Sequence, residues 1–371
     1  MKKIAFIAVN DTAPWGGSEE LWAQTALRMA QMGYTIGASV KGWKTKPAKI
    51  AELEQSQISV TYRNSDRNKL DKAAFFLHRG KQFYQWLDRF RPDLALISQS
   101  ANCDGLLWME ACAQRDIPYA VVSHVAAENH WIPDSSAARL AQAFAQAKQS
   151  FFVSQDNIDL TAKQIGANIP NASVIRSPYN VSRHAAPLWL PTEKGFKLAC
   201  VGRMHPTSKG QDLILEVMRL EKWRDRPLTV TFFGEGEHKE SLKRLADLWN
   251  LENVKFGQFT SDVESIWENH HALILPSRYE GGPLVTVEAM LCGRPCIVTN
   301  LALNKECIQD NVNGFLIKAP IAELVDEALE RAWQQRENWY ELGKAAAVKV
   351  RQVIPADPIS VFTKKIVNLL N

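Results

Sequence analysis

Short apolar runs alternate with longer amphipathic segments from one end of the chain to the other. Apolar runs of about four to eight residues predict buried strands, and apolar positions that recur every three or four residues predict helices. Strands are expected at Lys3–Val9, Tyr34–Val40, Ile58–Tyr62, Leu94–Ser98, Tyr119–Ser123, Phe151–Ser154, Ser173–Arg176, Lys197–Val201, Leu228–Phe233, Val254–Phe256, His271–Leu275 and Pro295–Val298, and helices among others at Glu19–Met32, Asn68–Phe90, Cys103–Arg115 and Leu284–Leu291. Repeated strand–helix units predict an α/β fold whose parallel sheets are covered on both faces.

The alternation is interrupted by Ser177–Gly195, which is rich in proline and turn residues and is interpreted as a linker. At 371 residues the chain is too long for one core of ordinary size. We therefore expect two Rossmann-like parallel-sheet domains facing a cleft, residues 1–180 and 196–356, joined by residues 181–195. Ligands of such sheets bind beyond the carboxyl ends of the strands.

Composition and cysteine spacing indicate a globular protein with reduced thiols. Hydrophobic residues make up 46% of the chain, and no segment approaches the ~18 uninterrupted apolar residues of a membrane span. The apolar run at the start is only six residues long before Asn10, and no cleavage site follows, so we interpret it as a strand rather than a signal peptide. The six cysteines lack metal or redox spacings, which predicts free buried thiols and a cytoplasmic protein.

Positive charge is concentrated in one part of the chain. The formal net charge is +4, whereas residues 41–91 contain twelve Lys or Arg and five acids, a net charge of +7. This concentration predicts an anionic partner surface. The expected helix Asn68–Phe90 also carries a stripe that mixes aromatic and cationic residues, namely Lys72, Phe75, Arg79, Gln82, Trp86 and Arg89. Such a stripe is typical of a helix lying on an anionic bilayer, and an ordinary solvated face is the alternative.

The segment Pro276–Met290 holds the most informative chemistry, because two glutamates stand eight residues apart in it. Pro283 stands where a first helical turn would begin, which leaves the backbone N–H groups of Leu284 and Val285 free to bind phosphate. Glu288 lies one turn further in among apolar residues, where a carboxylate is costly unless donors satisfy it. A sugar diol is a suitable pair of donors. The segment therefore predicts a ligand that carries both phosphate and hydroxyl groups.

A second glycine-bounded loop, Gly202–Gly210, follows a predicted strand and opens a helix. It contains Arg203 and Lys209, two cations that suit a diphosphate. A solvated loop is the alternative interpretation. The turn Gly234-Glu235-Gly236 after the next strand lacks the full G-x-G-x-x-G pattern, which disfavours a nicotinamide cofactor.

Two candidate positions follow strands of the first domain. The glycines of Gly16-Gly17-Ser18 permit close backbone approach, and Ser18 is expected to cap the following helix, a role that needs no ligand. His124 follows the strand Tyr119–Ser123 and is either a packed polar residue or part of a site.

In combination these segments resemble the GT-B glycosyltransferases, specifically the retaining family 4 (glycosyl transferases group 1). The resemblance is carried, in family order over nearly the whole chain, by Gly16-Gly17-Ser18-Glu19, His124, Val201-Gly202-Arg203, Lys209-Gly210, Gly234-Glu235-Gly236, Pro276–Met290 and Asn313-Gly314-Phe315. It implies a GT-B fold in which residues 357–371 cross back to the first domain. It also implies transfer of a hexose from a nucleoside-diphosphate sugar to a hydroxyl acceptor, in polysaccharide, glycolipid or lipid-linked saccharide synthesis. Peripheral attachment to the inner face of the membrane through residues 41–91 fits a lipid-linked acceptor, and no nucleic-acid partner is expected.

The resemblance also implies roles for single residues. Arg203 and Lys209 look like the cations that hold the donor diphosphate, Glu280 like the contact to the hexose hydroxyls, and Glu288 like the ribose ligand. His124 would touch the donor sugar near the reaction centre. Backbone contacts around the sugar and the phosphates are expected from Gly16, Gly17, Gly202, Gly281, Gly282, Leu284 and Val285.

Two departures from the family pattern matter. Arg203 and Lys209 stand six residues apart, one more than the commonest spacing, and Gly282 takes a place often held by a larger apolar residue, which would widen the hexose pocket. The chain has no Asp-x-Asp motif, so neither a metal nor another cofactor is expected, and the two cations and the helix start supply the positive field. A front-face reaction, in which the departing phosphate takes the acceptor's proton, accounts for retention without a second carboxylate.

Two other functions stay open at this point. One is a different enzyme on the same fold, such as a phosphorylase or an epimerase, which would show phosphate dependence or hydrolysis without an acceptor. The other is a non-catalytic sugar-nucleotide-binding protein, against which the joint presence of Arg203, Lys209, Glu280 and Glu288 argues.

Overall fold

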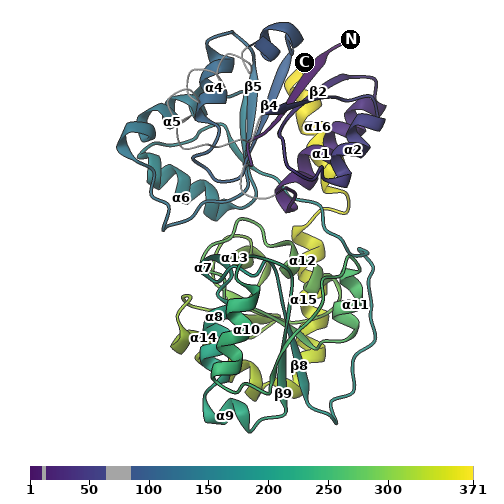
Figure 1. Cartoon of the computed structure of the whole chain (residues 1–371), viewed down its shortest axis with the longest axis vertical. Coiled ribbons are helices and arrows are strands. Elements are labelled where there is room, and N and C mark those ends of the chain that lie inside the picture. Colours follow the sequence, from purple (N-terminus) through teal and green to yellow (C-terminus); the bar gives the residue numbers. More distant parts are fainter. Residues whose placement is uncertain (11–13, 64–84, 371) are drawn as a thin grey trace. The chain divides into compact units, whose positions relative to one another are not determined.

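The computed structural model describes residues 1–10, 14–63 and 85–370. The chain forms two compact units, unit 1 comprising Met1–Pro178 with Asp357–Asn371, and unit 2 comprising Tyr179–Ala356 (Figure 1). Each unit is built on one parallel sheet covered by helices. The predicted α/β architecture of two Rossmann-like domains is therefore confirmed.

The sheet of unit 1 has the order β3-β2-β1-β4-β5-β6-β7, and all its pairs are parallel. Its strands are β1 (Lys3–Ala8), β2 (Thr35–Lys41), β3 (Ser59–Arg63), β4 (Leu94–Gln99), β5 (Tyr119–Ser123), β6 (Gln149–Phe152) and β7 (Ala172–Val174), and its helices include α1 (Gly17–Gln31), α2 (Ala48–Gln55), α4 (Leu106–Ala113), α5 (Asp134–Gln146), α6 (Gln155–Ile165) and α16 (Pro358–Leu370). Apolar clusters lie on both faces, and the neighbours Phe151 and Phe152 of β6 belong to different ones. Burial on both faces explains why the strands read as continuous apolar runs.

Helix α16 comes from the end of the chain but packs on α1 of unit 1 (Figure 1). Its residues Ile359, Phe362 and Ile366 join the apolar cluster on that face, at the spacing of an amphipathic helix. The Phe362 ring meets Phe151 edge-on, with ring centroids 5.2 Å apart. Burial of this face holds the last helix to the first unit.

The sheet of unit 2 has the order β10-β9-β8-β11-β12-β13, again with parallel pairs. Its strands are β8 (Phe196–Val201), β9 (Leu228–Phe233), β10 (Val254–Phe256), β11 (Ala272–Leu275), β12 (Cys296–Thr299) and β13 (Gly314–Ile317). Its helices include α7 (Pro206–Lys209), α8 (Gln211–Met218), α9 (Glu221–Arg224), α10 (Lys239–Leu248), α11 (Val263–Glu268), α12 (Leu284–Leu291), α13 (Asn304–Cys307), α14 (Ala322–Gln334) and α15 (Trp339–Val353), with the 3₁₀ turn η2 (Arg336–Asn338) before the last. The core contains the fully buried Trp223, Trp267 and Trp339.

In each sheet the strand order reverses once, between β1 and β4 in unit 1 and between β8 and β11 in unit 2. The carboxyl ends of the strands at such a reversal are where open α/β sheets bind ligands. The loop with Gly16-Gly17 follows β1, the loop Gly202–Gly210 follows β8, and the segment that begins at Pro276 follows β11. The fold therefore brings the loops singled out in the sequence to the reversal points.

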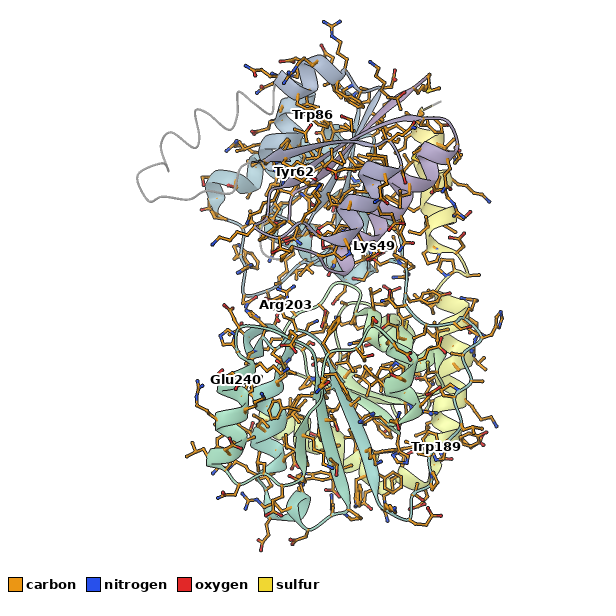
Figure 2. All side chains as sticks on the ribbon, turned by 45° about the vertical axis from the view of Figure 1, so that its right-hand side comes forward. Lys49, Tyr62, Trp86, Trp189, Arg203 and Glu240 are labelled. Atoms are coloured by element: carbon orange, nitrogen blue, oxygen red, sulfur yellow. The ribbon has the colours of Figure 1, made fainter. Side chains whose placement is uncertain are left out.

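The interpretation of Asn68–Phe90 as a membrane-facing helix is tested only at its end. Residues 64–84, and with them most of the proposed stripe, lie outside the described part of the chain; residues 85–90 are helical. Trp86, a member of the proposed stripe, is labelled in Figure 2. It is 7% exposed and stacks on Phe90, with ring centroids 5.5 Å apart. Its assignment to an outward stripe is wrong, because the ring belongs to the apolar cluster under the sheet. Within the described ranges, no helix has the length and apolar character to span a membrane.

Candidate functional site

The site of unit 2 is built from the loops that follow the adjacent strands β8 and β11. Arg278, in the second loop, ties the two loops together: its amide donates to the Ser208 carbonyl at 2.8 Å, and its guanidinium donates to the Pro206 carbonyl at 2.7 Å. The same guanidinium forms a two-pronged ion pair with Asp212 on α8, with both N···O distances 2.7 Å. Such planar, bidentate pairs fix orientation as well as distance. Arg278 therefore fixes the position of the second loop relative to the first.

A glycine permits this close approach. Gly210 has a φ of +68°, and a Cβ at this position would lie 2.2 Å from the carbonyl oxygen of Pro276. A side chain is excluded on both counts, by the left-handed backbone and by the neighbouring loop. The glycine that follows Lys209 therefore lets the first loop turn directly beneath the second.

Lys209 and Glu280, 71 residues apart in the chain, meet at this junction. The Lys209 ammonium forms an ion pair with Oε1 of Glu280. The Ser277 hydroxyl donates to the same oxygen at 2.8 Å. Glu280 is 9% exposed and the side chain of Lys209 is 22% exposed. A cation and a carboxylate therefore lie side by side, and both are largely shielded from water. This arrangement can bind a phosphate on the cation and hydroxyl groups on the carboxylate.

Arg203 differs from Lys209 in being exposed (Figure 2). Its backbone carbonyl accepts a 2.7 Å hydrogen bond from Nε2 of Gln211, which anchors the loop. The guanidinium itself makes no hydrogen bond or ion pair with the residues that the structure describes. An exposed guanidinium on an anchored loop is suited to bind an anionic ligand.

Glu288, on α12, is 4% exposed and has its own partner within unit 2. Its Oε1 accepts two hydrogen bonds from Asn180, one from the backbone amide and one from Nδ2, each 2.9 Å long. Burial raises the pKa of this carboxyl group, and the two Asn180 donors oppose the rise. Both contacts are to one oxygen, so the carboxylate can accept further donors, as the expected ribose contact requires.

The sequence alone does not indicate a role for Asn180, because this residue lies in the segment Ser177–Gly195, whose composition indicates only a linker. The signal that was present is an amide residue in a Pro-rich turn, Pro178-Tyr179-Asn180. Its partner stands 108 residues away, and nothing local in the sequence links the two.

Helix α12 begins where the sequence predicted, after Pro283 as the N-cap residue, and no side chain caps it. The first-turn amides of Leu284 and Val285 have no intrahelical acceptor, as at any helix start. Gly281 is buried and Gly282 half-buried just before it. These backbone groups lie on the same loop as Glu280, so the arrangement can bind an anion at the helix start.

In unit 1 the glycine loop leads into α1, but its capping differs from the prediction. Gly16 is the N-cap residue and Gly17 the first helical residue, and no side chain caps the helix. Ser18 instead donates to Oε2 of Glu19 at 2.6 Å, so the expected capping role of Ser18 is wrong. Glu19 is 5% exposed and also accepts a 3.0 Å bond from Nδ2 of Asn10. This buried carboxylate in the first turn of α1 was not among the predicted site residues.

His124 lies directly after β5 and is buried. Its Nε2 is 3.2 Å from the hydroxyl of Ser98, at the end of the adjacent strand β4. Burial lowers the pKa of this imidazole to about 4. The ring is therefore neutral near pH 7 and can accept or donate a hydrogen bond, but carries no charge.

The structure thus brings Lys209 and Glu280 into direct contact and sets Arg203, Gly202, Gly281, Gly282, Leu284, Val285 and Glu288 on the same two loops and helix of unit 2. Gly16, Gly17 and His124 lie at carboxyl ends of strands in unit 1.

Residues 189–347 match the family described as Glycosyl transferases group 1. The poly(ribitol-phosphate) alpha-N-acetylglucosaminyltransferase of Staphylococcus aureus (strain COL) is 32% identical over 153 residues, which cover 40% of this chain and 30% of that protein. An Escherichia coli UDP-Gal:alpha-D-GlcNAc-diphosphoundecaprenol alpha-1,3-galactosyltransferase is 38% identical over 87 residues, covering 23% of this chain and 22% of that protein. The chain spans less than a third of the length of these relatives.

Solved structures match over the whole chain. HepE of Anabaena in complex with UDP has a TM-score of 0.77 at 17% identity, covering 100% of this chain and 99% of that one. A mutant of S. aureus TarM, in complex with Fondaparinux, alpha-GlcNAc-glycerol and UDP, has a TM-score of 0.72 at 16% identity and covers 100% of both chains. At these identities the likeness establishes the fold, which is the two-domain GT-B fold. The segment that matches the family, residues 189–347, lies within unit 2.

Proposed function

We propose that this chain is a retaining glycosyltransferase of family 4 that moves a hexose from a nucleoside-diphosphate sugar to a hydroxyl acceptor. The observation that carries the proposal is the Lys209–Glu280 pair at the strand-order reversal of unit 2, with Arg203 on the neighbouring loop and Glu288 on the following helix. Two relatives are sugar transferases by name, and the matched HepE structures hold UDP or UDP-glucose. These names support a nucleotide-sugar donor.

The contacts suggest how the donor is divided among the residues. Arg203 and Lys209 bind the diphosphate, Glu280 binds hexose hydroxyls, and Glu288 binds the ribose. Because Lys209 and Glu280 touch, the boundary between phosphate and sugar falls at their contact. The amides of Leu284 and Val285 add donors to the phosphate oxygens, and Gly281 and Gly282 leave room for the sugar.

The proposed reaction retains the anomeric configuration by a front-face route. The bond between the anomeric carbon and the phosphate oxygen breaks, the acceptor oxygen bonds to that carbon on the same face, and the departing phosphate takes the acceptor's proton. The chain contributes positioning and a positive field, which stabilises the charge that grows on the leaving phosphate. The neutral His124, with Gly16 and Gly17, is assigned to the donor from unit 1.

We propose that this field needs neither a metal nor another cofactor at the diphosphate, because no Asp-x-Asp motif is present in the sequence. Transfer is expected to persist in EDTA. Complete loss in EDTA that Mg²⁺ or Mn²⁺ restores would refute the metal-free assignment.

The acceptor is proposed to be a saccharide or a lipid-linked saccharide, with the enzyme in the cytoplasm and in contact with an anionic membrane through residues 41–91. In the described part of this segment several cations have internal partners. Lys46 pairs with Glu54 at 2.7 Å, Lys49 pairs with Glu52 at 3.1 Å, and Arg63 donates to the Ala8 carbonyl at 2.6 Å. A membrane contact would therefore depend on the remaining cations of the segment. Salt-sensitive sedimentation with anionic vesicles, lost in the Arg79→Glu/Arg89→Glu variant, tests it, and indifference to such vesicles at low salt would exclude it.

A panel of nucleoside-diphosphate sugars tests the proposed function directly. The true donor is expected to raise the melting temperature by mass action, and to yield the nucleoside diphosphate only when a saccharide acceptor is present. Phosphate-dependent turnover or epimerised sugar would instead favour a phosphorylase or an epimerase on the same fold. Binding without any turnover across acceptors would favour a non-catalytic sugar-nucleotide-binding protein.

A further inference from the structure

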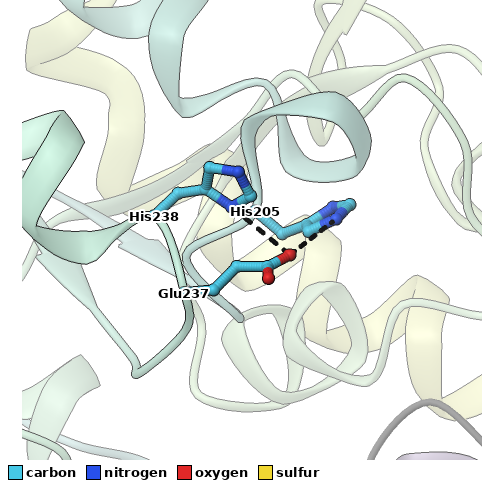
Figure 3. A group of neighbouring side chains, drawn as sticks. All are labelled: His205, Glu237 and His238. Atoms are coloured by element: carbon cyan, nitrogen blue, oxygen red, sulfur yellow. Dashed lines mark ion pairs between the residues drawn. The ribbon is translucent and has the colours of Figure 1, made fainter. Parts of the chain in front are cut away.

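Two histidines and a glutamate converge at one side of the unit 2 site, and one of them, His205, lies on the loop that carries Arg203 (Figure 3). Oε1 of Glu237 lies 3.8 Å from Nε2 of His205 and 3.6 Å from Nδ1 of His238. One nitrogen or oxygen from each of the three side chains lies within 4.8 Å of the others. His205 follows β8, and the other two follow the neighbouring strand β9. The cluster is separate from the Lys209–Glu280 pair and is not used by the proposed reaction.

The backbone holds these two loops together before any ligand binds. The Met204 amide donates to the Glu235 carbonyl at 3.0 Å, and the His238 amide donates to the Met204 carbonyl at 3.4 Å. Gly236 allows the two loops to approach closely, since a Cβ at this position would lie 2.5 Å from the Met204 carbonyl oxygen. The three side chains therefore project from a braced framework.

The hydrogen bonds of His205 orient its second nitrogen. The Ser208 hydroxyl donates to the His205 carbonyl at 3.2 Å, so at 3.0 Å from Nδ1 it is placed to accept the Nδ1 proton. That tautomer leaves a lone pair on Nε2, which is the nitrogen nearest Glu237. The Thr207 hydroxyl lies 3.1 Å from Nδ1 and 3.4 Å from Nε2, and a metal ion on Nε2 would replace the longer of these contacts. Metal-binding histidines commonly donate their other ring N–H to an oxygen in this way.

His238 supplies an independent observation. Its Nδ1 is buried and makes no hydrogen bond within the described part of the chain. It points to the same carboxylate oxygen as Nε2 of His205, at 3.6 Å. Three Lewis bases thus face one another, and a shared cation would satisfy all of them.

We propose that His205, Glu237 and His238 bind one divalent transition-metal ion, for which Zn²⁺ is the best fit. Two imidazole nitrogens and one carboxylate oxygen are a common zinc ligand set, with a fourth position left to water. In a tetrahedral site with bonds of about 2.0–2.1 Å, the ligand atoms lie roughly 3.3–3.4 Å apart. The two distances to Glu237, 3.6 and 3.8 Å, require shifts of only a few tenths of an ångström, and the two histidine nitrogens, which lie within 4.8 Å of each other, would also have to move together. The side chain of Glu237 is 74% exposed, which gives the ion a way in.

The ion would join the loop after β8 to the start of α10, and so hold the loop that carries Arg203. This inference goes beyond the proposed sugar transfer and does not depend on it. Its test therefore reads metal binding and melting temperature rather than turnover.

The experiment uses the full chain, stripped with EDTA and exchanged into metal-free buffer. Zn²⁺ is titrated against a chromophoric competitor, and Co²⁺ binding is followed by its visible absorption, which is intense only for a tetrahedral site. One ion per chain is expected, with a rise in melting temperature. No binding, or Co²⁺ absorption typical of octahedral coordination by water alone, would overturn the proposal.

Variants locate the ion. His238→Ala and Glu237→Gln are each expected to weaken Zn²⁺ binding at least tenfold, and Glu237 is exposed enough that its substitution leaves the fold intact. The exposed His184→Ala and Glu240→Gln, outside the cluster, serve as matched controls and are expected to bind like the parent. Equal affinity in all four would show that the ion sits elsewhere. Stabilisation by inorganic phosphate but not by Zn²⁺, lost in His238→Ala, would make the cluster an anion site and refute the metal assignment.

Discussion

At the scale of single residues, both buried carboxylates of the unit 2 site have a partner that is far away in the sequence. Glu280 is held by Lys209 and Ser277, and Glu288 by the two donors of Asn180. A buried carboxylate without donors would cost several kcal/mol, so each of these contacts is needed before a ligand arrives. The sequence indicates Glu288 from its apolar neighbours, and Glu280 through the resemblance to the glycosyltransferase pattern. It could not identify Asn180, because the pairing depends on the tertiary fold.

The cations are the first residues to test. Arg203→Ala and Lys209→Ala are each expected to lower transfer by roughly 10²–10³-fold, as for the loss of an electrostatic donor to a leaving group. Lys209→Ala also leaves Glu280 without its cation, so its melting temperature should fall, whereas that of Arg203→Ala should not. Lys318→Ala, an exposed cation outside the site, is the control. Near-normal turnover in the Arg203 variant would refute its proposed role in binding the donor diphosphate.

The two glutamates should act on different parts of the donor. Glu288→Gln is expected to weaken binding of both the donor and the bare nucleoside diphosphate by about 10- to 100-fold, the value of one or two charged hydrogen bonds. Glu280→Gln should weaken binding of the donor only, because it frees Lys209 for the phosphate. Calorimetry with both ligands separates the two effects. If Glu280→Gln harmed both equally, the proposed division between sugar and nucleotide would be wrong.

Buried histidine makes stability depend on pH. Burial lowers the pKa of His271 to about 4, and its Nδ1 accepts a 2.9 Å hydrogen bond from the Lys197 amide. In the unfolded chain the pKa of a histidine is about 6.5, so the unfolded state takes up a proton at a higher pH than the folded state does. The contribution of neutral His271 to the free energy of unfolding is therefore complete above about pH 6.5 and is lost as the pH falls toward 4. The loss for this group reaches roughly 3 kcal/mol at pH 4.

The measurement is urea unfolding at pH 7 and at pH 4.5. His271→Asn, which keeps an acceptor but cannot be protonated, should lose less stability between the two pH values than the parent. His184→Asn, an exposed position, should behave like the parent. An unchanged pH dependence in His271→Asn would contradict the assignment.

At the scale of elements, local pattern predicts most of the fold, and long-range pairing accounts for the rest. Strand β9 and helix α12 have the predicted bounds, because each is a mainly apolar segment with clear ends. Strand β13 was not predicted; its four residues begin with Gly314, which disfavours a strand. It exists because it pairs with β12, where a Cβ on Gly314 would lie 2.8 Å from the Cys296 carbonyl oxygen. Neither contact can be inferred from the local sequence.

A substitution in the last helix tests how much this helix, which comes from the end of the chain, contributes to the stability of unit 1. Phe362 of α16 is 1% exposed against Phe151, so Phe362→Ala should lower the free energy of unfolding by about 3–5 kcal/mol. Val361, its neighbour, is 42% exposed, and Val361→Ala should change stability by no more than about 0.5 kcal/mol. Chemical denaturation compares them. Equal, small effects would mean that α16 does not help to stabilise unit 1.

At the scale of the whole molecule, the chain passes between the units twice, at Pro178–Tyr179 and at Ala356–Asp357. The candidate donor residues are divided accordingly, with Arg203, Lys209, Glu280 and Glu288 in unit 2 and Gly16, Gly17 and His124 in unit 1. If both sets bind one donor, as the proposed function requires, donor binding must couple the units. Two chain crossings are the natural positions for the backbone rotations of such a motion.

We therefore expect the units to close on the donor, with rotation in Ser177–Gly195 and at the start of Asp357–Asn371. Small-angle scattering should show a smaller radius of gyration with a saturating nucleoside-diphosphate sugar than without it. Arg203→Ala, which should not bind the diphosphate tightly, is the matched control and should show little change at the same ligand concentration. Closure requires differential affinity for the closed arrangement, so it should grow with donor occupancy. An unchanged scattering curve at full occupancy, verified by calorimetry on the same sample, would count against a donor shared by the two units.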